Sequence, residues 1–318
     1  MARLAIFVVC VIVVALSGCA PITAPQGLEH VSPMLGSDSF VTRDGTVLPL
    51  RHWDAKDPRA VIVALHGMSD YSHAFAMPAA YWAGQGITLY AYDQRGFGRA
   101  PHSGLWPGST VMQQDLHDCV EAVRARHPGL PLFVLGESMG GAVVLTGLAS
   151  PEPPRADGVI LVAPAVWSRD DMPFYYRMAL WVTAHTVPGM TVSGRGLKIW
   201  PSDNIEMLRA NSRDPLFQKK TRTDAIWGLV NLMDEARKAP EAITKAPPIL
   251  MLYGEKDQII PRKPTEAVRK VLEAKLGAEV HVYPKGYHML LRDLQAEVIW
   301  KDAVAFVDAH AKAAPSPR

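Results

Sequence analysis

Short, uninterrupted runs of apolar residues recur along the chain, and between them apolar residues come at helical spacing. Such a run is typical of a strand that is buried on both faces of a parallel sheet. The runs predict strands at 60–65, 87–92, 132–135, 159–162, 249–253 and 280–283. The helical spacing predicts helices at 72–83, 109–127, 139–149, 264–276 and 291–310. Strands that alternate with helices in this way indicate an α/β fold, with a mostly parallel central sheet flanked by helices.

Two segments depart from this alternation. Residues 39–53 hold two short strand-like pieces around Asp44-Gly45, which is a hairpin signal. Residues 166–245 contain no convincing buried strand, and their apolar spacing is helical, as in Ile226, Leu229, Val230 and Met233. We therefore expect a core made by 37–165 and 246–312, a helical cap inserted at 166–245, and a loose tail at 313–318.

The first 18 residues have the pattern of a secretory signal peptide. Arg3 precedes an unbroken apolar run from Leu4 to Leu16, which is shorter than the ~20 residues that a membrane-spanning helix needs. An uncleaved anchor is the alternative interpretation. Leu16-Ser17-Gly18-Cys19 follows, and it resembles the lipobox of bacterial lipoproteins, in which the cysteine is lipidated and becomes the first mature residue.

This resemblance implies that Cys19 anchors the mature chain to a membrane of the bacterial cell envelope. The next residue is Ala20 and not an acidic residue, which favours the periplasmic face of the outer membrane over the inner membrane. Several acyl chains on one cysteine anchor a protein stably, whereas a single chain binds marginally. Residues 19–36, which include Pro21, Pro25 and Pro33, are then expected to form a tether.

Composition narrows the class of protein. The 318 residues are 48% hydrophobic and 20% charged, so the chain does not have the composition of a disordered protein. Its 33 Lys and Arg nearly balance 31 Asp and Glu, which gives no broad basic surface for nucleic acid. With Cys10 in the signal and Cys19 lipidated, Cys119 has no partner for an internal disulfide. Because no residues have metal-ligand spacing and no glycine-rich loop has a phosphate-binding pattern, we expect no metal and no cofactor.

The clearest chemical motif is Gly136-Glu137-Ser138-Met139-Gly140-Gly141, between a predicted buried strand and a predicted helix. This is the G-x-S-x-G nucleophile elbow in its required context, and it makes Ser138 the candidate nucleophile. The backbone N–H of Met139 is one candidate donor to an oxyanion. A second comes from Leu65-His66-Gly67-Met68, after the first buried strand, where the backbone N–H of Met68 is the candidate. We expect His66 to brace this loop.

The remaining catalytic groups follow the last two predicted strands. Tyr253-Gly254-Glu255-Lys256-Asp257 supplies an acid, with Asp257 as the candidate and Glu255 as its rival. Gly286-Tyr287-His288 supplies an imidazole at a strand's carboxyl end. The order Ser138, Asp257, His288 is that of the α/β-hydrolase triad and differs from the orders in chymotrypsin and subtilisin. The sequence therefore predicts acyl-transfer chemistry.

Residues 44–312 resemble the monoacylglycerol lipase and lysophospholipase branch of the α/β-hydrolases, a serine aminopeptidase-type family. The segments that carry the resemblance are the nucleophile elbow, Asp93-Gln94-Arg95-Gly96-Phe97-Gly98, His127-Pro128-Gly129-Leu130-Pro131, Asn211-Ser212-Arg213-Asp214-Pro215-Leu216 and Gly286-Tyr287-His288. The resemblance implies the α/β-hydrolase fold, the triad roles named above and, for Asp93 and Arg95, a role in pinning a turn. It leaves the substrate open, because such families also include carboxylesterases and peptidase-like proteins.

The main hypothesis is a serine hydrolase that cleaves a carboxylic ester of a lipid-like substrate, a monoacylglycerol or a lysophospholipid, through an acyl-enzyme. One alternative keeps the triad but acts on peptides or short-chain esters, and another is a binding lipoprotein without catalysis. Two apolar groups in the predicted cap either line an acyl tunnel or pack the cap on the core. They are Phe174, Tyr175, Tyr176, Met178, Leu180, Trp181 and Val182, and Ile226, Trp227, Leu229, Val230 and Met233.

Overall fold

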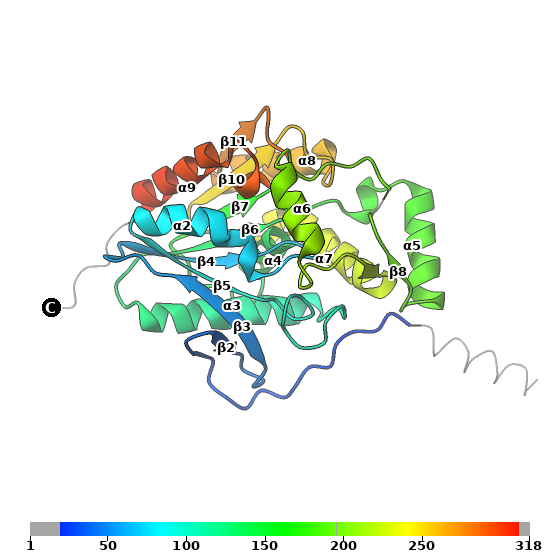
Figure 1. The fold of residues 1–318 in the computed structure, drawn as a ribbon, viewed down its shortest axis with the longest axis horizontal. Coiled ribbons are helices and arrows are strands. Elements are labelled where there is room, and N and C mark those ends of the chain that lie inside the picture. Colours follow the sequence, from blue (N-terminus) through cyan, green and yellow to red (C-terminus); the bar gives the residue numbers. More distant parts are fainter. Residues whose placement is uncertain (1–19, 195, 312–318) are drawn as a thin grey trace, which may run out of the picture.

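A computed structural model describes residues 20–194 and 196–311, and its described strands form one large sheet and one small two-stranded sheet (Figure 1). The signal peptide, Cys19 and the predicted tail lie outside the described residues. The order in the large sheet is β1-β2-β3-β5-β4-β6-β7-β10-β11. Its strands are β1 Met34–Leu35, β2 Ser39–Val41, β3 Val47–Trp53, β4 Ala60–Leu65, β5 Ile87–Tyr92, β6 Leu132–Glu137, β7 Gly158–Val162, β10 Ile249–Gly254 and β11 Glu279–Tyr283.

The sheet is parallel from β5 to β11, and β1, β2 and β3 add an antiparallel edge. The predicted α/β fold with a mostly parallel sheet is therefore confirmed. The predicted strands at 60–65 and 87–92 coincide with β4 and β5, in which every residue is buried. An apolar side chain fits either face of such a strand, because helices cover both faces.

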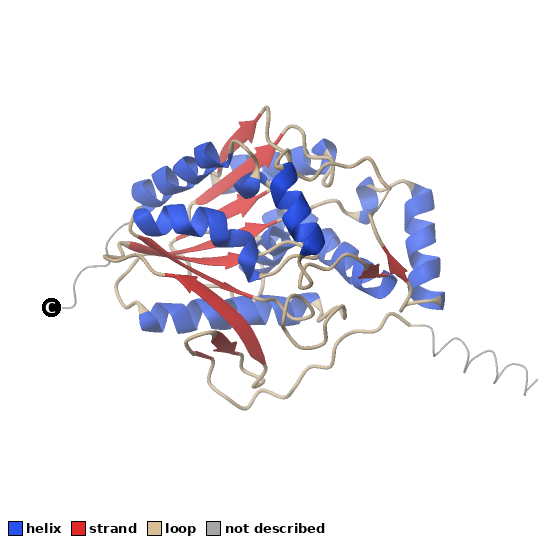
Figure 2. Ribbon diagram, in the orientation of Figure 1, coloured by secondary structure: helices blue, strands red, loops and turns tan. Residues whose placement is uncertain are grey.

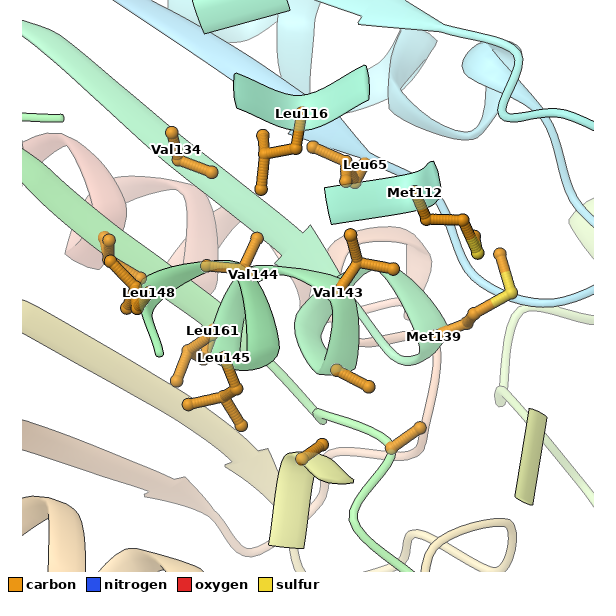
Figure 3. Close-up of a cluster of buried hydrophobic side chains, with 14 of the residues drawn as sticks. Leu65, Met112, Leu116, Val134, Met139, Val143, Val144, Leu145, Leu148 and Leu161 are labelled. Atoms are coloured by element: carbon orange, nitrogen blue, oxygen red, sulfur yellow. The ribbon is translucent and has the colours of Figure 1, made fainter. Parts of the chain in front are cut away.

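Helices cover the two faces of the sheet in separate layers (Figure 2). The flanking helices are α2 Ala76–Gly84, α3 Ser109–Arg126, α4 Met139–Leu148, α8 Arg262–Leu276 and α9 Ala296–His310. Alternate side chains of β4 divide between two buried clusters. Val61, Val63 and Leu65 join the cluster of α3, α4 and α8, part of which Figure 3 shows, whereas Ala60, Ile62 and Ala64 join that of α2 and α9. Because successive side chains of a strand point to opposite faces of the sheet, one apolar strand contributes to two hydrophobic layers.

The predicted hairpin at 39–53 is present as β2 and β3, and a buried arginine fastens it to the core. Arg95 Nη1 lies 2.7 Å from Asp44 Oδ2, and Arg95 Nε lies 2.7 Å from Asp115 Oδ2 in α3. The neighbouring Asp93 accepts hydrogen bonds from the backbone N–H groups of Ser72 and Arg99, at 2.9 Å each. Arg95 and Asp93 therefore pin turns, as the family resemblance implies.

Residues 166–245 contain α5 Phe174–Thr186, β8 Thr191–Val192, α6 Ile205–Arg213, β9 Thr221–Arg222 and α7 Thr223–Ala242. The two short strands pair with each other and not with the main sheet. Helix α7 packs against α4 and α8, and its Val230, Leu232 and Met233 belong to the same buried cluster as α4. Although α7 lies in the predicted cap segment, one of its faces is thus part of the core.

The segment predicted as a tether lies along the body over its described part. The backbone N–H of Ala24 donates to the carbonyl of Trp106 at 2.8 Å, and Thr23 forms an isolated bridge with the same residue. Further along, Met34–Leu35 pairs with β2 as an edge strand. Across 20–194 and 196–311, we find no helix with the length and apolarity needed to cross a membrane.

The last predicted helix begins later than expected. Residues Leu290–Arg292 form a 3-10 turn, η3, and Asp293 is extended, so α9 starts at Ala296. This turn begins two residues after His288, and its Arg292 contacts residues of the site described next.

Candidate active site

Ser138 lies at the sharp turn between β6 and α4, with a φ of 53° and a ψ of −114°. A positive φ is strained for a residue with a side chain and persists where the surroundings enforce it. The surroundings here are tightly packed glycines. A Cβ on Gly140 would collide with the carbonyl oxygen of Leu65, and one on Gly136 would lie 2.5 Å from the carbonyl oxygen of Gly140. The glycines of the motif are therefore needed for the close approach of β4, β6 and α4 that presents Ser138.

The structure brings Ser138, His288 and Asp257 together in one chain of hydrogen bonds. Ser138 Oγ lies 2.9 Å from His288 Nε2, and His288 Nδ1 lies 2.8 Å from Asp257 Oδ2. An ionised carboxylate only accepts, so Nδ1 carries the proton and Nε2 accepts from the Ser138 hydroxyl. This is the tautomer that a general base for Ser138 requires.

Asp257, and not its rival Glu255, is the acid that meets the imidazole. The Asp257 side chain is fully buried, and its second oxygen, Oδ1, accepts from the backbone N–H groups of Ile259 at 2.7 Å and Ile260 at 3.0 Å. Glu255 is exposed. The sequence did not decide which of these two residues is the acid. The geometry of the loop after β10 decides it, because only Asp257 points at His288.

The loop with Met68 runs beside the nucleophile. A Cβ on Gly67 would lie 3.2 Å from Ser138 Cβ, so the backbone before Met68 is in close contact with the elbow. Met139 is the first residue of α4, and an N–H at that position has no acceptor within its own helix. Both candidate oxyanion donors thus lie next to Ser138, on two different strand-end turns.

His66 holds the Met68 loop in place. Its Nδ1 donates to the carbonyl of Gly67 at 2.9 Å, and its Nε2 accepts from the backbone N–H of Gln94 at 3.0 Å. The ring is fully buried, and burial lowers the pKa of His66, which keeps the imidazole neutral and able to accept. The expected bracing role of His66 agrees with this geometry.

Burial by itself lowers the pKa of His288, but the neighbouring carboxylates outweigh it. The charge and hydrogen bond of Asp257 and the charge of Glu137 stabilise the imidazolium, whereas Arg292 opposes it. The net result is a pKa above the ordinary value for histidine. An imidazolium that is stabilised in this way favours proton transfer from Ser138 as the serine attacks.

Sequence reasoning missed the buried charges around this triad. Glu137, Arg292 and Asp70 are each 5% exposed or less, and each lies in or next to a loop that carries a catalytic group. A charged residue inside the elbow motif and an arginine four positions after His288 were the available signals. Among the residues that the structure describes, no cluster of three or more His, Cys, Asp or Glu side chains could hold a metal ion.

The two apolar groups of the predicted cap differ in environment. On α5, every member of the group except Leu180 is exposed, from Phe174 at 72% to Val182 at 43%, so those six side chains neither pack the cap on the core nor line an enclosed tunnel. On α7, Val230 and Met233 are buried in the core cluster. Ile226 and Leu229 are half-buried against it, together with Met68.

A family model described as serine aminopeptidase, S33 matches residues 56–295. The chain is 28% identical over 291 residues to a monoacylglycerol lipase of Mycolicibacterium smegmatis, which covers 88% of this chain and 99% of that protein. It is 26% identical over 268 residues to phospholipase YtpA of Bacillus subtilis, and this match covers 81% of this chain and 98% of that protein.

Among solved structures, a soluble variant of monoglyceride lipase from Saccharomyces cerevisiae in complex with a substrate analogue superposes with a TM-score of 0.71. It is 19% identical, and the match covers 91% of this chain and 100% of that one, which supports the fold. Because the family match spans most of the chain, including the elbow, the Met68 loop, Asp257 and His288, the protein belongs to the serine aminopeptidase S33 family of α/β-hydrolases.

Proposed function

We propose that the protein is a serine hydrolase that cleaves carboxylic esters of lipid-like substrates, such as a monoacylglycerol or a lysophospholipid. The observation that carries the proposal is the hydrogen-bonded chain from Ser138 through His288 to Asp257, beside two candidate oxyanion donors. The matched relatives support the substrate class, since they include a monoacylglycerol lipase and a phospholipase.

The proposed reaction follows from these positions. Ser138 Oγ attacks the ester carbonyl while His288 Nε2 takes its proton, and the negative charge on the carbonyl oxygen is stabilised by the N–H groups of Met68 and Met139. His288 then protonates the leaving alcohol, and the acyl group stays on Ser138. Water attacks this acyl-enzyme with His288 again as base, which releases the fatty acid and restores the serine. Loss of one oxyanion donor costs about 10²- to 10³-fold in kcat in such enzymes.

Half-buried apolar side chains of the Met68 loop, α5 and α7 favour an acyl chain as the group that is transferred. Met68, Leu180, Ile226 and Leu229 are half-buried and pack against the cluster that contains Met139. Half-buried apolar side chains gain contacts when an apolar ligand covers them. Each methylene buried contributes about 0.8 kcal/mol, or about fourfold in binding.

A substrate panel tests the acyl preference. We expect kcat/KM to rise about fourfold per methylene across soluble acyl esters until the pocket is filled. Long-chain monoacylglycerols and lysophospholipids should then exceed acetyl esters and amino-acid amides. The measurement is initial rate against acyl length at matched concentrations below any micelle threshold. An optimum on acetyl esters or on amides would replace the lipid proposal by the short-chain esterase or the peptidase alternative.

We further propose that the exposed face of α5 meets the lipid surface that supplies the substrate. Phe174, Met178 and Trp181, which are 72%, 51% and 54% exposed, come at i, i+4 and i+7 and share one face of the helix. Patches of this kind mark protein or membrane contacts, and Trp and Tyr are typical of membrane interfaces. The sequence from 172 to 200 contains three Lys or Arg and no Asp or Glu, which suits anionic lipid.

Polar substitutions on this face should separate interfacial from soluble activity. We expect Phe174→Ser combined with Trp181→Ser to lower hydrolysis of a monoacylglycerol in anionic vesicles about tenfold or more, since each ring contributes apolar burial of about 1.5–3 kcal/mol. Hydrolysis of a soluble short-chain ester should change far less. Val298→Ser is the matched control, because Val298 is 53% exposed on α9. Equal loss on both substrates would contradict a lipid-contact role.

We propose, in addition, that Cys19 is lipidated and holds the protein at the periplasmic face of the outer membrane. The lipobox-like sequence directly after an apolar run of signal-peptide length supports this. Cys19→Ser is expected to release the mature protein into the soluble fraction or to leave it unprocessed, as read by membrane fractionation and intact mass. An unchanged fraction and an unchanged mass would rule the anchor out.

A further inference from the structure

We propose that Glu137 and Arg292 are positioning residues, a buried pair of opposite charges that joins the catalytic loops and sets the position and charge state of His288. The inference rests on the proposed function, because it assigns a role toward His288 as the base for Ser138. Neither residue touches the reacting atoms in this proposal. Each acts through the imidazole.

The Arg292 guanidinium contacts two other loops at once. Its Nη2 lies 3.2 Å from Glu137 Oε2, and its Nη1 lies 2.7 Å from Asp70 Oδ2, an ion pair without hydrogen-bond alignment. Arg292 comes four residues after His288, Glu137 directly precedes Ser138, and Asp70 comes two residues after Met68. One side chain therefore ties together the loops of the base, the nucleophile and the oxyanion hole.

The same turn of Arg292 and Asp293 also fixes the loop of His288 to the segment before α6. The Asn204 side-chain amide donates to the carbonyl of Arg292 at 2.9 Å, and Ser202 Oγ donates to Asp293 Oδ1 at 2.6 Å. Asp293 Oδ2 accepts from the backbone N–H of Tyr287 at 2.7 Å. Hydrogen bonds thus hold the backbone of the His288 loop both before His288, at Tyr287, and after it, at Arg292. The Arg292 side chain adds the ion pairs with Glu137 and Asp70.

Stability alone is a poor explanation for this pair. Glu137 Oε1 and Arg292 Nε are buried with no hydrogen-bond partner. Burying charged groups is costly, and replacing a buried ion pair by apolar residues is often neutral or stabilising. Buried charges with incomplete partners cluster at functional sites, and here they lie beside the triad.

Three charged side chains act on His288 directly: Asp257 from the loop after β10, Glu137 from β6, and Arg292 from the turn after His288. Asp70, from the loop after β4, pairs with Arg292, and Asp293 binds the backbone N–H of Tyr287. Lys256 lies 5.3 Å from the ring of Tyr287, the residue before His288. The imidazolium is stabilised by the negative charge of Glu137 and destabilised by the positive charge of Arg292, so the two act on the pKa of His288 in opposite directions.

These opposite effects give the pair a signature in the pH profile. His288 accepts a proton only when neutral, so activity falls as pH falls through its pKa. Removing the Glu137 charge should lower that pKa. The acid limb, which is the fall in activity on the low-pH side of the profile, should then move to lower pH. Removing the Arg292 charge should raise the pKa of His288 and move the limb to higher pH, provided that Glu137 stays ionised; burial raises the pKa of Glu137 and the Arg292 charge opposes that rise. A contact that only supported the fold would lower the plateau and leave the limb in place.

The experiment measures two rates from about pH 5 to pH 9 on the full mature protein: hydrolysis of a soluble butyrate ester and labelling of Ser138 by a fluorophosphonate. The variants are Glu137→Gln, Arg292→Met and Arg292→Lys. Asp118→Asn is the control, since it removes a buried carboxylate that pairs with Arg43 in another part of the molecule. We expect the ratio of the rate at pH 5.5 to the plateau to rise about twofold or more in Glu137→Gln and to fall by a similar factor in Arg292→Met.

Arg292→Lys and Asp118→Asn should keep the wild-type acid limb. Limbs that coincide with wild type in both charge-removing variants, or that move in the same direction, would overturn the proposal. If Arg292→Met does not fold, the comparison uses Glu137→Gln and Arg292→Lys. The proposal is then overturned if the acid limbs of these two variants coincide. Failure of the proposed function looks different, because Ser138 would then not be labelled in the wild-type protein. If Ser138 is labelled but the ester is not hydrolysed, the pH dependence of the labelling rate still tests the role of Glu137 and Arg292.

Discussion

Replacing Ser138 with alanine is expected to lower kcat for ester hydrolysis by about 10⁴-fold or more while the protein stays folded. The substitution removes the hydroxyl oxygen, which lies 2.9 Å from His288 Nε2. It leaves the glycines of the turn and helix α4 intact. No other group in the site can then form the acyl-enzyme. The residual rate would come from the oxyanion donors and from substrate binding alone.

The measurement is single-turnover and steady-state hydrolysis of the best ester in the substrate panel, with thermal unfolding to verify the fold. Fluorophosphonate labelling should disappear in parallel. Esterase activity within tenfold of wild type in a labelling-negative, folded variant would mean that Ser138 is not the nucleophile.

Asp257→Asn is expected to cost about 10⁴-fold in kcat, nearly as much as loss of the nucleophile. The asparagine amide would present a donor to His288 Nδ1 in place of an acceptor. The imidazole would then carry its proton on Nε2, the wrong tautomer to accept from Ser138. The loop should stay in place, because Oδ1 continues to accept from the N–H groups of Ile259 and Ile260.

Glu255→Gln provides the matched control, two residues away on the same loop but exposed. It should change kcat by less than about twofold, because Glu255 does not bind His288 and substitutions at such exposed positions rarely disturb the fold. The pair of variants is compared by kcat on one ester at the pH plateau. Similar losses in both, or a larger loss in Glu255→Gln, would contradict the assignment of Asp257.

Much of the fold follows from patterns that are local in the sequence. β4 and β5 were predicted to the residue because a strand buried on both faces must be apolar throughout. The Ser138 elbow was recognisable because its glycines, the preceding strand and the following helix are all contiguous. His288 and Asp257 were recognisable because parallel strands deliver their carboxyl ends to one edge.

Other features depend on contacts that the sequence does not display. The spacing of apolar residues in α7 is the same whether they face a cap or a core, so its packing on α4 was not predictable. The edge strand β1 has only two residues and forms through pairing with β2. Glu137 and Arg292 are 155 positions apart, and although each lies close to a catalytic motif, the sequence does not show that their side chains are buried against each other.

The attachment of Thr23 and Ala24 to Trp106 would limit how far a lipid on Cys19 lets the molecule stand from a bilayer. If Cys19 carries the lipid as proposed, only the four peptide units from Cys19 to Thr23 separate the acyl chains from the folded body, a reach of at most about 14 Å. So short a tether would keep the enzyme at the membrane surface, and a lipid substrate would reach it by lateral diffusion in two dimensions instead of through water.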